Sequence, residues 1–308
     1  MKSFLFISLF ALLLISCSEK PSEKPLTFKN EKDKLSYVLG AMNAKTIVAS
    51  NESSFLQLDK KLLIKGFNDN LNNVSADECL ETIKLLFGPD YRDFNKKYVK
   101  PGSLCMGKMT GHAFYSDMKK LGGLDEVNLA MVKKGYADGL YRKDTIISEN
   151  NMRQIMQNFL VGLNVKNGEK MLSMAKKLPG AQVFPNGIVM LAIKEGTGGF
   201  PGTTDDVKVH YILKSAMGDT IQDSHKMKNA LGKSEPVPLQ LNGGVIQGWS
   251  FALPKMRKGG TYRLYVPWDL AYGAEGGKES LCFDIDLIDY APSGSFVKPN
   301  PSTQMGGY

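Results

Sequence analysis

The sequence is poor in the residues that bind metals and carry out nucleophilic catalysis. Its 308 residues include 4 cysteines and 3 histidines, and these are neither clustered nor paired with one another. It also lacks a glycine-rich loop of the phosphate-binding kind. These absences argue against an enzyme that works through a metal or an activated nucleophile, and we expect no cofactor and no metal.

The chain also lacks an apolar run long enough to span a bilayer. The apolar run at residues 4–15 is short, follows Lys2 and ends at Ser16 and Cys17. This order predicts a lipoprotein signal peptide over residues 1–17, rather than a transmembrane anchor or a buried strand. Leu14-Ile15-Ser16-Cys17 resembles the bacterial lipobox, which implies lipidation of Cys17 and membrane attachment through its acyl chains.

Residues 18–30 are polar and rich in lysine and glutamate, and they contain Pro21 and Pro25. This composition predicts a flexible tether. Ser18 directly after the cysteine resembles the signal that sorts lipoproteins to the outer membrane. We therefore expect a membrane-anchored lipoprotein of the bacterial cell envelope, at the outer membrane and facing the periplasm, although the membrane and the face stay open.

The formal net charge of +8 is spread along the chain. Lysines are scattered from Lys29 to Lys278 without a basic cluster interleaved with aromatic residues. Nucleic-acid binding calls for such a cluster, so we expect no nucleic-acid partner.

Three cysteines remain once Cys17 is lipidated: Cys79, Cys105 and Cys282. Cys79 and Cys105 could form a disulfide in an oxidising periplasm or remain separate buried thiols. We expect separate thiols. Cys282 lies in a predicted strand and is expected to face the core.

The front half of the chain reads as helical, because apolar residues recur at helical spacing over residues 31–178. Residues 65–71 and 134–140 share lysine, glycine, an aromatic residue, aspartate and leucine in the same register. Gly40 precedes the first segment and Gly111 the second, and each segment is followed by a serine, Ser75 or Ser148, that looks like a helix N-cap. We interpret this as an internal repeat, with copies at about residues 33–95 and 102–165 followed by a linker helix.

The back half changes to short β-type runs separated by turn residues, with one helix expected at residues 246–256. The pattern predicts an antiparallel sheet packed on that helix, so the chain as a whole is α+β: a helical domain over residues 31–178 and a sheet domain over residues 179–292. The proline- and glycine-containing residues 293–308 are expected to be a disordered tail.

Several short motifs of the sheet domain occur in a specific order: Val207-Lys208-Val209-His210-Tyr211, Asp223-Ser224, Val245-Ile246-Gln247-Gly248-Trp249, Ala271-Tyr272-Gly273 and Leu281-Cys282-Phe283. In this order they resemble the FKBP-type peptidyl-prolyl cis-trans isomerases over about a hundred residues. The helical half is similar to the domain that precedes the catalytic domain in macrophage-infectivity-potentiator-like members, in which two chains interlock into a dimer. The resemblance implies an FKBP-like sheet wrapped on one short helix, and proline-containing polypeptides as clients.

Because a single chain here carries the helical unit twice, we expect the two copies to pair within one molecule and to give a monomer with an internal pseudo-dimer. The alternative is a homodimer formed through the helical domain.

The resemblance also assigns the site. It makes Trp249 the pocket floor, Tyr272 the donor of a hydroxyl to a substrate carbonyl, and Asp223 a polar wall residue. It places four further side chains in the walls: Tyr211, Val245, Ile246 and Phe283. His210 alternates with Tyr211 on a strand, so we expect it to point away from the pocket and to have no catalytic role.

Three departures from the family are visible. Gln222 stands where the family usually has phenylalanine, and Leu239 stands at a substrate-binding position that is usually aromatic. Only residues 274–280 join Gly273 to Leu281, where the family has a longer apolar loop. We therefore expect a wider, wetter pocket and a weak isomerase that assists the folding of exported envelope proteins. The alternative is an inactive FKBP-like chaperone or assembly factor that binds clients through the helical domain.

Overall fold

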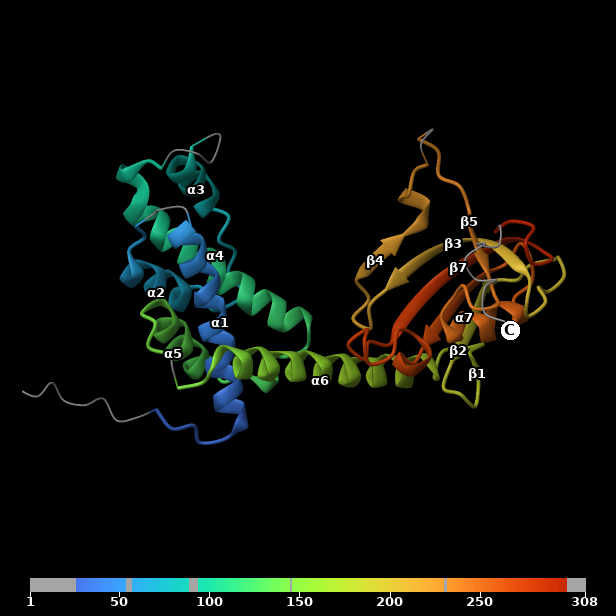
Figure 1. Ribbon diagram of the computed structural model, residues 1–308, viewed down its shortest axis with the longest axis horizontal. Helices are drawn as coiled ribbons and strands as arrows, with labels where there is room; N and C mark the ends of the chain where they lie inside the picture. Colours follow the sequence, from blue (N-terminus) through green and yellow to red (C-terminus); the bar gives the residue numbers. More distant parts are fainter. Residues whose placement is uncertain (1–25, 54–56, 89–93, 145, 230–231, 298–308) are drawn as a thin grey trace, which may run out of the picture.

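The computed structural model describes residues 26–53, 57–88, 94–144, 146–229 and 232–297. The predicted signal peptide, Cys17 and most of the predicted tether lie outside these residues. Figure 1 shows a helical half and a sheet half joined by one long helix. Among the described residues, no helix is both long and apolar enough to cross a membrane.

The helical half contains six α-helices over the described residues. They are α1 (Glu31–Ser53), α2 (Lys60–Asp69), α3 (Cys79–Phe87), α4 (Val99–Lys120), α5 (Leu129–Leu140) and α6 (Glu149–Ala175). Four of them begin at a side-chain cap, Asn30 for α1, Asp59 for α2, Asn128 for α5 and Ser148 for α6. The predicted cap at Ser148 is thus confirmed. Ser75 instead accepts from the backbone N–H of Asp77, ahead of α3, and is not a helix cap.

The helices that pack together are not consecutive in the sequence. α1 packs against α5, and α2 packs against α4. Both crossings bring backbones into direct contact. A Cβ at Gly40 would meet the Val132 carbonyl, and one at Gly135 would meet the Tyr37 carbonyl. At the other crossing, Gly66 lies against the Leu104 carbonyl and Gly107 against the Leu63 carbonyl. Such approaches are possible only without a side chain, which is why glycine is tolerated inside these helices.

The two crossings use matching residues. The backbone N–H of Asn128 donates to the Ser36 hydroxyl at 2.7 Å, and that of Asp59 donates to the Ser103 hydroxyl at 2.9 Å. Gly40 therefore corresponds to Gly107, whereas the sequence comparison matched it to Gly111. Between the crossings, the rings of Phe67 and Tyr136 stack with centroids 3.8 Å apart. Both side chains are fully buried.

A disulfide joins Cys79 at the start of α3 to Cys105 in α4. The expectation of two separate thiols was therefore wrong. Cys282 is a free, buried cysteine. It is 7% exposed and is among the buried apolar residues of the core, as predicted.

The sheet half is an antiparallel sheet wrapped on one short helix. Its strands are β1 (Gln182–Val183), β2 (Val189–Lys194), β3 (Asp206–Lys214), β4 (Thr220–Asp223), β5 (Val237–Gln240), β6 (Thr261–Val266) and β7 (Leu281–Ala291), and its helix is α7 (Gln247–Ala252). The strand order is β1-β2-β6-β7-β3-β4, and β5 also pairs with β3. Trp249 and Ala252 of α7 pack into the core that the sheet provides. The predicted α+β class is thus confirmed.

Residues 293–297 are docked on the sheet, although we expected disorder from residue 293. The backbone N–H groups of Phe296 and Val297 each donate to the buried carboxylate of Asp206 at 2.8 Å. The Lys208 ammonium lies 4.3 Å from the centre of the Phe296 ring. The sheet half therefore includes residues 293–297, and the rest of the expected tail lies outside the described residues.

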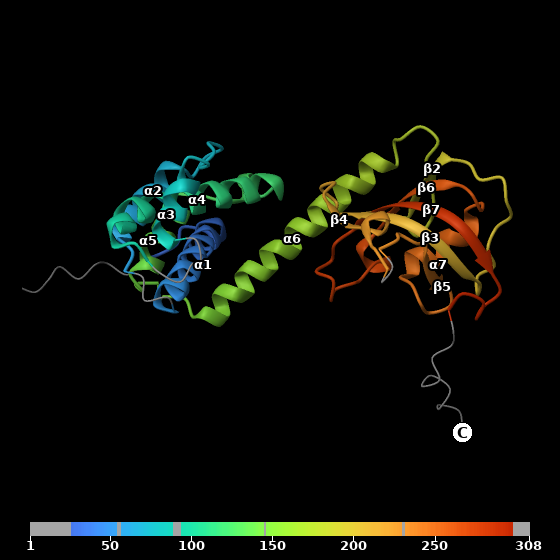
Figure 2. The ribbon, with the colours of Figure 1, turned by 90° about the horizontal axis from the view of Figure 1, so that it is seen from above.

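The linker is one continuous helix. α6 runs from the helical half to the sheet half (Figures 1 and 2) and includes Gly162 and the Asn167-Gly168 pair without interruption. It ends at Ala175, and Gly180 follows with a φ of 78°.

Candidate functional site

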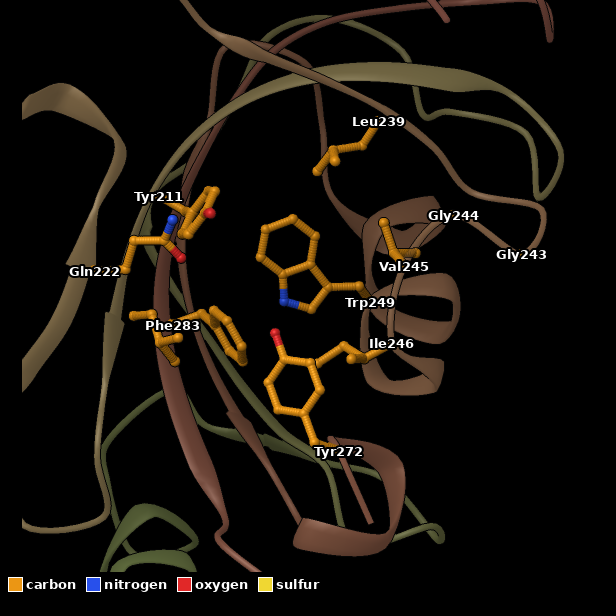
Figure 3. A pocket seen from close by; sticks show the side chains of 11 residues that line it. Tyr211, Gln222, Leu239, Gly243, Gly244, Val245, Ile246, Trp249, Tyr272 and Phe283 are labelled. Atoms are coloured by element: carbon orange, nitrogen blue, oxygen red, sulfur yellow. The ribbon is translucent and has the colours of Figure 1, made fainter. Parts of the chain in front are cut away.

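A cavity of about 380 Å³ opens between α7 and the concave face of the sheet. Figure 3 shows side chains from opposite walls pointing into it. The cavity is lined by Tyr211, Leu213, Gln222, Leu239, Gly243, Gly244, Val245, Ile246, Trp249, Tyr272 and Phe283. Of the side chains that the sequence singled out for the pocket, all but Asp223 are in this set.

Strand alternation and pairing explain the sheet wall of the cavity. Tyr211 and Leu213 are two residues apart on β3, so they project from the same face. Leu213 is paired with Phe283 on β7 and with Gln222 on β4, and directly opposed residues share a face. The hydrogen-bonding register therefore gathers side chains from three strands at one place.

Trp249 is the floor of the cavity. It projects from α7, is 4% exposed, and meets the rings of Tyr211 and Phe283 edge-on at 5.3 Å and 5.2 Å between centroids. Its indole N–H is buried and has no acceptor among the described residues. Figure 3 shows this nitrogen on the side of the cavity where the Tyr272 hydroxyl lies. A buried donor without a partner is costly, so a bound carbonyl at this place would gain a hydrogen bond.

Two tyrosine hydroxyls lie at the cavity. Burial, and secondarily the nearby Tyr272, raise the pKa of Tyr211. Tyr211 therefore stays protonated at neutral pH and can donate. Tyr272 is 58% exposed and follows the short helical turn η5 (Trp268–Leu270), so a ligand can reach its hydroxyl from solvent.

Asp223 does not reach the cavity. It follows Gln222 on β4, so its side chain projects from the opposite face of the strand. There its carboxylate pairs with His225 and Lys226 at 3.2 Å each. Burial opposes ionisation, but the hydrogen bonds from Lys226 and His225 hold the pKa of Asp223 below its usual range. The predicted place of Asp223 in the pocket wall was wrong.

His210 lies on the same side of the sheet as Asp223, away from the cavity, as its alternation with Tyr211 predicts. Its ring stacks on that of His225 with centroids 4.5 Å apart, and its Nδ1 lies 3.2 Å from the Ser224 hydroxyl. Neither histidine is in a position to exchange a proton with a molecule in the cavity.

The lining also includes Leu213, which the sequence analysis missed, and Gly243 and Gly244, which precede Val245. Leu213 follows Tyr211 by two residues on a strand, which is a signal that period-two alternation offers. Gly243 adopts a φ of 82°, so the two glycines form a turn that leaves one wall without side chains. Residues 274–280 contribute nothing to the lining, so the cavity has no apolar lid from this loop.

Comparison with known proteins places this chain in a family. Residues 198–288 match the family described as FKBP-type peptidyl-prolyl cis-trans isomerase. The chain is 30% identical over 207 residues to the peptidyl-prolyl cis-trans isomerase Mip of Coxiella burnetii, covering 60% of this chain and 84% of that protein. It is 32% identical over 186 residues to the outer membrane protein MIP of Legionella longbeachae, covering 54% of this chain and 76% of that protein.

Among solved structures, FkpA from Escherichia coli matches 65% of this chain and 98% of its own, at 24% identity and a TM-score of 0.38. This TM-score is too low to assign the fold. The fold is assigned from the strand pairing described above, and the family from the sequence matches. The chain belongs to the FKBP-type peptidyl-prolyl cis-trans isomerases of the macrophage-infectivity-potentiator kind and is an isomerase of the bacterial cell envelope.

Proposed function

We propose that the cavity over Trp249 is the isomerase site, and that an X–Pro segment of a client polypeptide binds there. The observation that carries this proposal is the buried indole, which is flanked edge-on by two aromatic rings and whose N–H has no acceptor in the described part of the chain. A proline ring fits against the apolar floor, and a carbonyl of the same segment can accept a hydrogen bond.

The reaction calls for no nucleophile. Resonance in the C–N bond holds the barrier between cis and trans near ~20 kcal/mol. The twisted amide has lost this conjugation and some of its polarity, so an apolar, water-poor surface favours it over the planar form. Hydrogen bonds from Tyr272 and Trp249 to the flanking carbonyls would hold the segment while the bond rotates.

The lining residues divide by chemistry. Tyr211, Val245, Ile246 and Phe283 form apolar walls around Trp249, and Tyr272 supplies a hydroxyl. Gln222 and Leu239 lie where the client chain would continue beyond the proline, and we assign them to substrate binding.

We expect the activity to be weak. Gln222 brings a polar amide into the wall, Gly243 and Gly244 add no apolar surface, and residues 274–280 do not cover the cavity. Water therefore reaches the bound amide and reduces the preference for its twisted form. For the same reason, macrocyclic inhibitors of the family should bind poorly.

The test is the cis-to-trans isomerisation of a proline tetrapeptide by the chain and by the variants Tyr272→Phe and Trp249→Ala. A rate above the uncatalysed reaction that falls in both variants supports an isomerase that uses this cavity. If the chain gave no rate above background, the second candidate would stand: an inactive chaperone or assembly factor with a degraded prolyl pocket. The substituted pocket residues Gln222 and Leu239 are the observation that favours it.

In the envelope, we infer that the helical half captures exported clients while the sheet half isomerises their prolines. Lipidation of Cys17 and the tether to residue 30 would hold the enzyme at the outer membrane, facing the periplasm. Labelled palmitate should appear in the chain and not in Cys17→Ser, and equal labelling of the two would exclude this anchor.

We also propose that the helical half is a duplicated unit, with copies at about residues 33–95 and 102–165, and that the enzyme is a monomer. The matched crossings of α1 with α5 and of α2 with α4 support this proposal, because they occupy within one chain the faces through which two chains would otherwise interlock.

A further inference from the structure

The middle of α6 touches the loop that carries Tyr272. The side-chain amide of Asn164 donates to the Gly277 carbonyl at 2.9 Å. One turn further along, Gly168 lies against Ser280, and a Cβ added at Gly168 would be 2.8 Å from the Ser280 Cβ. Helix and loop are therefore in close contact at two successive turns of α6.

An adjoining side of α6 is bound to the helical half. The side-chain amide of Asn167 donates to the Leu121 carbonyl at 2.9 Å, and Lys166 pairs with Glu126 at 2.6 Å. Leu163 is 3% exposed, and a Cβ at Gly123 would touch it. α6 is thus fixed to the helical half at the same turns where it contacts the loop.

The loop itself is a small, internally bonded unit. The backbone N–H of Gly276 donates to the Tyr272 carbonyl and that of Lys278 to the Gly273 carbonyl, each at 3.1 Å. At its far end, the Ser280 hydroxyl accepts from the backbone N–H of Trp268 at 3.2 Å. A displacement at Gly277 or Ser280 is therefore passed on to Tyr272, whose exposed side chain has little packing of its own.

We infer that Asn164 and Gly168 are positioning residues of the isomerase: they hold the loop of residues 271–280 so that the Tyr272 hydroxyl stays at the cavity. The linker helix then holds the loop that carries Tyr272, and the helical half affects the isomerase rate through this helix. The inference rests on the proposed function of the cavity.

Two matched pairs of variants in the full chain test this inference. Gly168→Ala places a methyl group against Ser280. Gly162→Ala lies on the same helix, and no atom of the described residues is within 4 Å of the new Cβ. Both changes favour helix formation equally, so they differ in the loop contact alone. Asn164→Ala removes the bond to Gly277, and Asn158→Ala is its control, because Asn158 bonds to Gln154 within α6.

We expect Gly168→Ala and Asn164→Ala to lower kcat/KM about tenfold and both controls to leave it unchanged. In a Tyr272→Phe background, Gly168→Ala should have no further effect, because both changes then act on the same hydroxyl. Effects that simply multiply in the double variant would overturn the inference.

Amide hydrogen exchange of residues 271–280 gives a second readout that does not depend on catalysis. These amides should exchange faster in Gly168→Ala than in Gly162→Ala. Equal protection in the two variants would refute the contact even in an active enzyme. Absence of isomerase activity in the unmodified chain would refute the proposed function instead, while the exchange experiment still decides whether α6 holds the loop.

Discussion

At the scale of single residues, the cavity depends on Trp249. The side chain combines a large apolar face with one N–H group, and the structure provides no acceptor for that group among the described residues. A residue that contributed only packing would not need a donor in this position. The indole N–H is therefore the feature that distinguishes a binding floor from an ordinary aromatic core.

Trp249→Phe tests this distinction. Phenylalanine keeps an aromatic floor and removes the donor, so we expect kcat/KM to fall about fivefold, which corresponds to the ~1 kcal/mol of one hydrogen bond. Trp249→Ala should in addition destabilise the sheet half by about 3–5 kcal/mol through the cavity that it leaves. Isomerase kinetics and thermal unfolding of both variants separate the two effects, and an unchanged kcat/KM in Trp249→Phe would contradict a role for the N–H.

His210 should make the stability of the sheet half depend on pH. Burial, and secondarily His225, lower the pKa of His210, while the carboxylates of Asp286 and Asp223 oppose this shift. Since the folded pKa lies below the unfolded one, the stabilisation is fully present above about pH 6.5 and is lost as the pH falls through the folded pKa. Thermal unfolding from pH 7.5 to pH 5 should therefore show a steeper loss for the unmodified chain than for His210→Gln. Equal slopes would exclude His210 as the cause.

At the scale of elements, the structure differs from the sequence-based prediction mainly in how helices and strands meet. Periodicity located the helices and strands, and ordered motifs located most of the pocket. Helical spacing could not decide between Gly107 and Gly111, because residues four apart lie on the same helix face. Asp223 and Gln222 are adjacent on a strand, so their motif could not show which of them faces the cavity without the register of β3 and β4. The Cys79–Cys105 disulfide forms because α3 packs against α4, and the residues around each cysteine give no sign of this packing.

The disulfide between α3 and α4 should stabilise the helical half. It closes a loop of 26 residues, and removing such a bond costs about 2–4 kcal/mol. Replacing Cys79 and Cys105 together by serine should lower the unfolding temperature of the helical half and leave isomerase activity unchanged. Reductant should have the same effect on the unmodified chain and none on the double variant. An unfolding temperature insensitive to both treatments would contradict a stabilising bond.

The close crossing of α2 and α4 should not tolerate even one methyl group. A Cβ at Gly107 would overlap the Leu63 carbonyl, so Gly107→Ala should reduce the free energy of unfolding by more than about 2 kcal/mol. Gly162→Ala, at an open position of α6, should increase it by about 0.5–1 kcal/mol. Denaturant unfolding of both variants measures the difference, and similar stabilities would mean that the two helices can move apart at no cost.

At the scale of the whole molecule, one sheet half is attached to one helical half that is already paired within itself. We therefore expect light scattering during gel filtration to give the mass of one chain at all concentrations. A mass of two chains that falls on dilution would instead support the homodimer and would leave the crossings of α1 with α5 and α2 with α4 as intrachain contacts of each subunit.

The internal pairing of the helical half also removes a constraint that symmetry imposes. In a dimer of identical chains, every substitution at the interlocked helices appears at both crossings at once. Here the two crossings are formed by different residues of one chain, so a substitution can alter one crossing and leave the other unchanged. The stacked pair of Phe67 and Tyr136 already differs by a hydroxyl, and one side ends in the short, disulfide-bound α3 while the other extends into the long α6. Substitutions on the α3 side can therefore change the stability of the helical half, while substitutions on the α6 side can change how the sheet half is attached.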